Sequence, residues 1–160
     1  MLKVMPSIHR KFLITGSIFV ILSAVPSAQA ALGGDASTIQ ADQVQMQGSR
    51  RIIPAESYTV HEIQAASGTV VREYLSPQGV VFALAWHGPF LPDMRQILGS
   101  YFEPYSQAAK SQPNSRLRRG PLLIEQPGLV VQSGGHLRSF AGKAYIPDML
   151  PAGLRAEDIQ

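Results

Sequence analysis

The sequence contains no cysteine among its 160 residues. Disulfide bonds, thiol catalysis, zinc–thiolate sites and iron–sulfur clusters are therefore excluded. Charged residues are also scarce, at 16% of the chain, and the formal net charge is +3. Lys3, Arg10 and Lys11 precede Phe12, and the other eleven basic residues balance the eleven acidic ones. The excess charge belongs to the N-terminus, which argues against a partner such as nucleic acid bound by general electrostatics.

The first thirty residues have the pattern of a secretory signal peptide. A basic start precedes an apolar stretch at 12–25, a break at Pro26, and small residues at Ala28 and Ala30. We expect export to the periplasm or beyond by the general secretory route, with cleavage after Ala30 and no stable membrane anchor afterwards. A retained anchor is the alternative, although a spanning helix needs about 20 apolar residues. The absence of cysteine excludes a lipoprotein anchor.

Residues 31–160 are enough for a single small domain with a core that needs no disulfides. At its start, Ser37 and Gln40 have the spacing of a capping box, which predicts a short helix at the domain edge. Runs of β-branched and aromatic residues at 58–65, 69–75 and 80–87 then predict three strands. The short breaks between these runs make the strands antiparallel neighbours in a meander.

Charge pairing indicates the register of the first two strands. A three-residue loop at 66–68, with Gly68 left-handed, sets Glu62 opposite Arg72 and His61 opposite Glu73, whereas a two-residue loop opposes two glutamates. Carried through the second turn, this register predicts a mainly apolar core face that also holds the His61–Glu73 pair. The apolar residues on that face are Ile63, Val71, Leu75, Val80, Phe82, Leu84 and Trp86.

One amphipathic helix stands out, starting at the capping residue Asp93. Its apolar residues recur at helical spacing from Met94 to Phe102, and Pro104 is expected to end or kink it. A loop is expected at 107–121, followed by strands at 122–125, 129–132 and 136–146 with a turn at 133–135. The predicted fold is α+β: an antiparallel sheet of about five strands, a meander plus a C-terminal hairpin, with this helix packed on one face.

Three residues are weak candidates for catalysis. Glu73 opposite His61 could orient the imidazole for base chemistry or metal binding. His136 follows Ser133 on a glycine-rich turn, but this turn lacks the Gly-x-Ser-x-Gly spacing of a nucleophile elbow. A hairpin that needs glycine explains it equally well. We expect no catalytic centre from these residues, and no cofactor.

Candidates for binding are equally weak. His61, His87 and His136 lack the spacing of metal ligands, so no metal site is predicted. Residues 86–90, from Trp86 and His87 to Phe90, could form an aromatic shelf, although Trp86 fits a core position better. The loop arginines could contact anionic lipid or polysaccharide, or remain solvated. They are Arg116, Arg118 and Arg119.

Several short blocks occur in order along the chain and carry a resemblance. They are LGG at 32–34, VVREY at 70–74, VFALAW at 81–86, GP at 88–89, PD at 92–93, GSYF at 99–102 and LVVQSGGH at 129–136. With these blocks, the chain from about Ala31 onward resembles the exported bacterial proteins grouped as domain of unknown function 2844. The resemblance implies a signal-bearing protein, mainly of proteobacteria, with no established activity and no assigned catalytic residue.

The sequence thus favours a non-catalytic exported protein that binds an envelope partner or serves as a cell-envelope accessory. One alternative is a small periplasmic hydrolase or metal-dependent enzyme using His61, Glu73 or His136. Another is a subunit of a surface assembly that pairs through an open sheet edge. The oligomeric state is left open.

Overall fold

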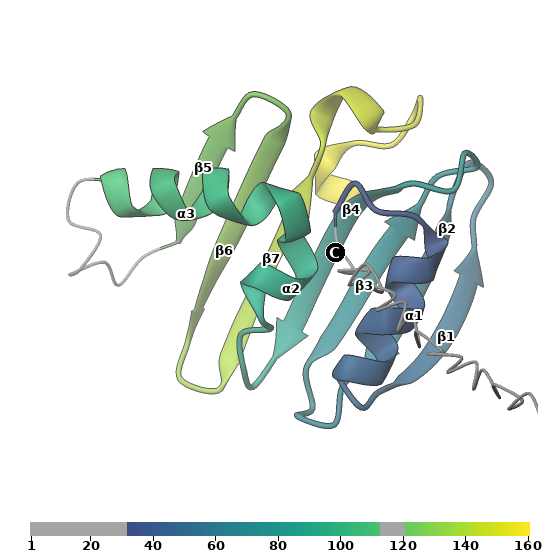
Figure 1. Ribbon diagram of the computed structural model, residues 1–160, viewed down its shortest axis with the longest axis horizontal. Helices are drawn as coiled ribbons and strands as arrows, with labels where there is room; N and C mark the ends of the chain where they lie inside the picture. The colour runs from purple at the N-terminus through teal and green to yellow at the C-terminus, as the bar shows by residue number, and fades with distance from the viewer. Residues whose placement is uncertain (1–31, 113–120) are drawn as a thin grey trace, which may run out of the picture.

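The computed structural model describes residues 32–112 and 121–160, and its centre is one antiparallel sheet of seven strands. The strand order is β1-β2-β3-β4-β7-β6-β5 (Figure 1). The strands are β1 (Ser49–Pro54), β2 (Thr59–Gln64), β3 (Val70–Leu75), β4 (Val81–Gly88), β5 (Leu122–Gln126), β6 (Leu129–His136) and β7 (Ser139–Tyr145). The expected signal peptide and residues 113–120 of the expected loop lie outside the described residues.

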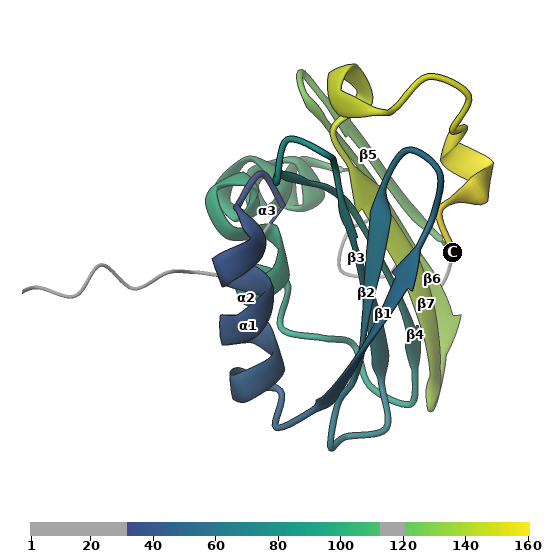
Figure 2. The same ribbon diagram turned by 90° about the vertical axis from the view of Figure 1, so that its right-hand side faces the viewer.

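The two sides of the sheet carry different elements (Figure 2). One side, here called the helix side, is covered by α1 (Ala36–Gln45), α2 (Met94–Leu98), the short η1 (Gly99–Tyr101) and α3 (Phe102–Ser111). The other, the C-terminal side, is partly covered by the segment 146–160, with η2 (Pro147–Met149) and η3 (Ala156–Asp158). No helix in the described ranges is long and apolar enough to cross a membrane.

The α+β class is confirmed, but the prediction of about five strands is too low. The strand missed was β1, whose sequence Ser-Arg-Arg-Ile-Ile-Pro lacks the apolar alternation of a half-buried strand. The predicted turn at 133–135 is also wrong, because β6 runs on through His136 and the turn falls at Leu137 and Arg138. Glycines inside the strand had indicated a turn, but Gly135 instead lets the neighbouring backbone approach closely, since a Cβ atom there would collide with the Ser139 carbonyl oxygen.

The predicted register of the meander is confirmed. Glu62 pairs with Arg72 and His61 with Glu73, and Gly68 has the expected positive φ of 87°. The face prediction fails only at the start of β4, where the pairing shifts between Tyr74 and Leu75. Because of that shift, Val81 packs on the helix side and Phe82 on the C-terminal side, the reverse of the prediction.

The main helix begins as predicted but is divided. Asp93 accepts hydrogen bonds from the backbone N–H groups of Arg95 and Gln96, at 2.9 and 3.3 Å. Gly99, with φ of 51°, ends α2. Pro104 does not end the segment, because it lies in the first turn of α3, where no backbone donor is required. The helix then reaches Ser111, so the loop starts later than the predicted residue 107.

The first helix forms as predicted, but its cap differs. Asp35, not Ser37, is the capping residue, and its carboxylate accepts from the Ser37 backbone N–H at 2.8 Å. The helix lies over the β1–β3 part of the sheet, on its helix side (Figure 1). It buries Thr38, Ile39 and Asp42, which brings a carboxylate to the sheet surface.

Each side of the sheet has its own apolar cluster. The helix-side cluster packs the sheet against α1 and α2. Its buried residues include Leu32, Ile39, Ile63, Val71, Leu84, Trp86, Ile97, Leu98, Leu129 and Ala144. The smaller C-terminal cluster joins the sheet to Ile159. Its other buried residues are Val60, Tyr74, Phe82, Ala83 and Ala85.

Candidate functional site

His61 and Glu73 are directly opposite on β2 and β3, and both are buried on the helix side. The Nδ1 atom of His61 and both carboxyl oxygens of Glu73 have no hydrogen-bond partner. Burial, followed by the charge of Arg50, lowers the pKa of His61, which favours the neutral imidazole. The pair therefore shares a face as the sequence predicted, without the hydrogen bond that would orient the imidazole.

A second carboxylate, from Asp42 on α1, meets Glu73 from the opposite layer. Asp42 is fully buried, Glu73 is 1% exposed, and the side-chain amide of Gln96 on α2 donates to Asp42 Oδ1. Burial is the main cause that raises the pKa of Glu73 well above its usual value, and the neighbouring Asp42 carboxylate adds to it. Burial also raises the pKa of Asp42. The folded state thus favours a proton shared between the two carboxyl groups.

Sequence reasoning missed Asp42 and Gln96 because each is one polar residue within a helix. A signal was present, since Asp42 is three residues after Ile39 and Gln96 is one residue before Ile97, both in the buried layer. Spacing alone could not distinguish a carboxylate facing the sheet from one facing water. The contact depends on how α1 and α2 lie over β3.

The Asp42–Glu73–Gln96 cluster is a structural link more than a reaction site. A groove of about 390 Å³ reaches Gln96, but neither carboxylate lines it. No group of three metal-ligating side chains suited to a metal ion occurs within 32–112 and 121–160. The arrangement can hold a proton and fasten two helices to the sheet, but it offers a substrate no route to the carboxylates.

His136 does not join the other catalytic candidates. It is exposed at the end of β6, and four strand intervals separate β6 from β2. At about 4.8 Å per interval, that is roughly 19 Å. Acid–base partners must lie within hydrogen-bond or one-water reach. Direct cooperation between His136 and the His61–Glu73 pair is therefore excluded.

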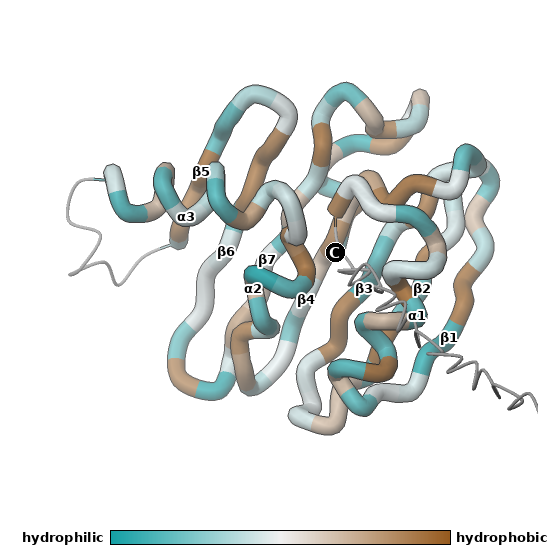
Figure 3. Tube along the Cα trace, in the orientation of Figure 1, coloured by the Kyte–Doolittle hydropathy of each residue, from teal (hydrophilic) through white to brown (hydrophobic). Residues whose placement is uncertain are grey.

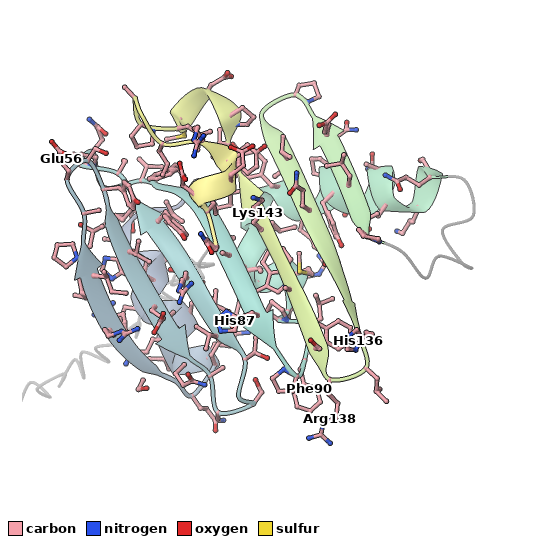
Figure 4. All side chains as sticks on the ribbon, turned by 180° about the vertical axis from the view of Figure 1, so that it is seen from behind. Glu56, His87, Phe90, His136, Arg138 and Lys143 are labelled. Atoms are coloured by element: carbon pink, nitrogen blue, oxygen red, sulfur yellow. The ribbon has the colours of Figure 1, made fainter. Side chains whose placement is uncertain are left out.

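The predicted aromatic shelf is also divided by the fold. Trp86 is 2% exposed and belongs to the helix-side cluster, whereas His87 is exposed on the opposite side (Figure 4). Phe90, two residues beyond the end of β4, is 54% exposed. The candidate arginines Arg116, Arg118 and Arg119 lie outside the described residues.

A hollow with a volume of about 600 Å³ lies on the C-terminal side. We call it the C-terminal groove. Its floor runs across β3, β4, β7, β6 and β5, and Ile159 and Gln160 form one wall. The lining residues are Arg72, Trp86, His87, Pro121, Leu122, Leu123, Gln132, Ser133, Gly134, Ala141, Gly142, Lys143, Ile159 and Gln160. No acidic residue is among them.

The cations of the groove are held in place by neighbouring groups. Arg72 donates to Glu62 at 2.8 Å and to the backbone oxygen of Gln160 at 2.7 Å. Lys143 donates to the Ala156 carbonyl at 2.6 Å. The small residues Gly134 and Ala141 also line the groove. A ligand in the groove would therefore contact backbone and apolar surface, with fixed donors at the rim.

The fold and this groove define a small α+β protein with a single sheet, a ligand-sized hollow and no gathered catalytic centre among its described residues. The chain belongs to the family described as "Protein of unknown function (DUF2844)", whose model matches residues 28–159. No curated protein and no solved structure matches the chain.

Proposed function

We propose that the protein is a non-catalytic exported binding protein of the cell envelope, and that it holds its ligand in the C-terminal groove. The groove itself carries the proposal. Its volume falls in the range of small-molecule sites, and its lining combines apolar side chains with a few polar groups. The separation of His136 from His61 and Glu73 supports binding over catalysis.

Lys143 is the residue best placed to orient a ligand. Its ammonium group has three donor hydrogens, and the Ala156 carbonyl takes one of them. The backbone of the glycine-rich stretch at 133–135 adds polar groups beside it on β6. A ligand with an apolar body and an acceptor group at one end fits these contacts.

The test compares ligand capture with the groove open and filled. Wild-type protein and Ala141→Trp would be recovered from the periplasm, and bound small molecules and proteins identified by mass spectrometry. Ala36→Trp, on the exposed side of α1, is the matched control. We expect a ligand shared by wild type and Ala36→Trp and absent from Ala141→Trp.

Two outcomes would contradict ligand binding in the C-terminal groove. Capture that is unchanged by Ala141→Trp would exclude the groove as the binding site. A stoichiometric bound metal in the purified protein would instead support the enzyme alternative. Elemental analysis of the same samples measures it.

A second candidate function is assembly through the edge strand β1. Only β2 pairs with this strand among the described residues, and Ile52 and Ile53 are 55% and 36% exposed. An unpaired strand edge can accept an additional strand. The other edge is less open, because the Gln112 side chain donates to the Leu123 carbonyl of β5 at 2.6 Å.

Charges on β1 test the assembly hypothesis. Ile52→Lys combined with Ile53→Lys would block strand addition, whereas Val44→Lys on α1 adds a charge to another exposed apolar site. Cross-linking in intact cells followed by electrophoresis measures assembly. Loss of a cross-linked species in the first variant alone supports the hypothesis, and its persistence contradicts it.

A further inference from the structure

One end of the molecule presents apolar side chains from two neighbouring loops. Leu137, in the turn between β6 and β7, is 87% exposed, and Phe90 and Leu91, after β4, are 54% and 46% exposed. The two loops adjoin because Gly88 pairs with Phe140 across β4 and β7. Figure 4 shows Phe90 beside Arg138 and His136 at this end. We call the residues Phe90, Leu91, Leu137 and Arg138 the apolar tip.

The turn at Leu137 and Arg138 combines an unfavourable backbone conformation with an exposed apolar side chain. Arg138 has a φ of 61°, a left-handed conformation that glycine or asparagine adopts at lower cost. Two-residue hairpin turns ordinarily carry glycine, asparagine or aspartate. This turn instead has the exposed Leu137 at its first position and Arg138, with a positive φ, at its second. Strain and exposure at the same turn indicate a contact outside the domain.

The charge of the apolar tip is positive. Arg138 makes no ion pair with any described residue, and exposed His136 adjoins the turn. Neither 88–91 nor 136–140 contains an acidic residue. The nearest acidic residue along the chain, Asp93, caps α2 with its carboxylate. Figure 3 shows the β6–β7 turn as a hydrophobic segment next to a hydrophilic one at the extremity of the sheet.

The small size of the apolar tip favours a bilayer over a protein as its partner. A stable protein interface buries roughly 1,200–2,000 Å² in total and has matching surfaces. Three apolar side chains at the ends of two loops offer much less surface than that. Leucine and phenylalanine flanked by a cation suit shallow insertion at the boundary between headgroups and acyl chains of an anionic membrane.

We propose that the apolar tip docks the domain on the surface of a bilayer containing anionic phospholipid. Leu137 and Phe90 enter the interface, and Arg138 meets the lipid phosphates. The strands then stand away from the membrane, with the C-terminal groove on one flank. This docking is carried by the tip residues alone, so it does not depend on the groove having a ligand.

Vesicle co-sedimentation tests the proposal on the protein as cells produce it, with intact mass measured for every variant. Vesicles of phosphatidylcholine alone are compared with vesicles that also contain the anionic lipid phosphatidylglycerol. We expect binding to the anionic vesicles that weakens as salt is added. Leu137→Ser combined with Phe90→Ser should lower the partition coefficient about tenfold or more. Arg138→Gln should lower it about fivefold, on anionic vesicles only.

Two controls separate the tip from other surfaces. Val44→Ser removes an apolar side chain that is 67% exposed on α1, and Lys110→Gln removes an exposed cation on α3. Both should bind like the wild type. Any residual binding by the N-terminal segment is common to all variants, so differences between them report the tip. Circular dichroism and thermal melting confirm that each variant is folded.

Insertion can also be observed directly. Tryptophan placed by Phe90→Trp should be quenched by brominated lipid, whereas tryptophan placed by Val44→Trp should not. Equal binding of wild type and the Leu137→Ser, Phe90→Ser variant would overturn the proposal, as would equal affinity for neutral and anionic vesicles. Self-association that is lost with the tip, without vesicle binding, would identify a protein interface instead and overturn it as well.

Discussion

The two sides of the sheet bury apolar surface in different ways. Helices α1, α2 and α3 cover the helix side, and even its polar residues Asp42 and Glu73 are withdrawn from water. The C-terminal side is covered by a segment with only short 3₁₀ turns, and the groove stays open beside it. The difference teaches that a sheet can bury ionisable groups under helices on one side and leave a groove open on the other, where the covering segment has only short 3₁₀ turns.

The largest expected effect comes from deleting matched isoleucines on the two sides. Ile97 on α2 and Ile159 near the C-terminus are both almost fully buried. Ile97→Ala should lower the free energy of unfolding by about 2–5 kcal/mol, because the packed helix cannot fill the cavity. Ile159→Ala should fall near the lower end of that range, since the C-terminal segment can relax into the space. Urea denaturation followed by circular dichroism measures both, and equal losses would contradict the comparison.

The next effect concerns two glycines in the hairpin of β6 and β7. A Cβ atom at Gly142 would collide with the Trp86 ring and lie 2.6 Å from the Gln132 carbonyl oxygen. Gly142→Ala should therefore destabilise the domain by about 1–3 kcal/mol. At Gly134 the nearest atom would be 3.7 Å away, so Gly134→Ala should change stability by no more than about 0.5 kcal/mol. Thermal melting of both variants tests this, and a tolerated Gly142→Ala would show that Trp86 can move.

The carboxyl pair on the helix side predicts a pH effect of smaller size. Because the pKa of Glu73 is raised in the folded state, that state binds more protons than the unfolded chain. Stability from this group is full below the ordinary glutamate pKa and declines as the pH rises through the folded value. Glu73→Gln should remove this decline, since a neutral amide can still donate to Asp42.

The measurement is the difference in unfolding free energy between wild type and Glu73→Gln as a function of pH. The difference is needed because His61, with its lowered pKa, gains stability as the pH rises. Glu125→Gln on exposed β5 serves as the control for removing one carboxylate. Parallel pH profiles for wild type and Glu73→Gln would show that the pair does not hold a proton.

The smallest effects belong to the ion pairs of Glu62. The side chain of Arg51 is 67% exposed, so Arg51→Ala should lower the free energy of unfolding by no more than about 0.5 kcal/mol. Arg72→Ala should cost more, because Arg72 is half as exposed and also holds the backbone oxygen of Gln160. Denaturation in low and high salt distinguishes the two. An equal, fully salt-sensitive loss would mean that Arg72 does not anchor the C-terminal segment.

Local patterns predicted much of the fold. The opposed charges of Glu62 and Arg72 set the register of the meander, and Asp93 set the start of α2. Local patterns failed where tertiary contacts overrode them. Strand β1 forms because it pairs with β2. Pro104 is tolerated because α2 ends at Gly99 and a new helix, α3, begins at Phe102, which places Pro104 in the first turn of α3.

The candidate site was less predictable than the fold. His61 and Glu73 could be paired from the sequence because neighbouring strands have a fixed side-chain period. Asp42 could not be joined to them, since it comes from a helix in another layer, packed on the face of the sheet (Figure 2). The C-terminal groove was also missed, because its lining comes from five strands and the chain end, far apart in sequence.

By itself, the sequence determined the α+β class, the pairing of the central strands and the absence of thiol chemistry, because these follow from residue types and short-range periodicity. Only the tertiary structure decided which polar residues were buried together, that His136 stands apart, and where surface was left open. Those outcomes depend on the layer packing of elements distant in the chain, and no local pattern carries that information.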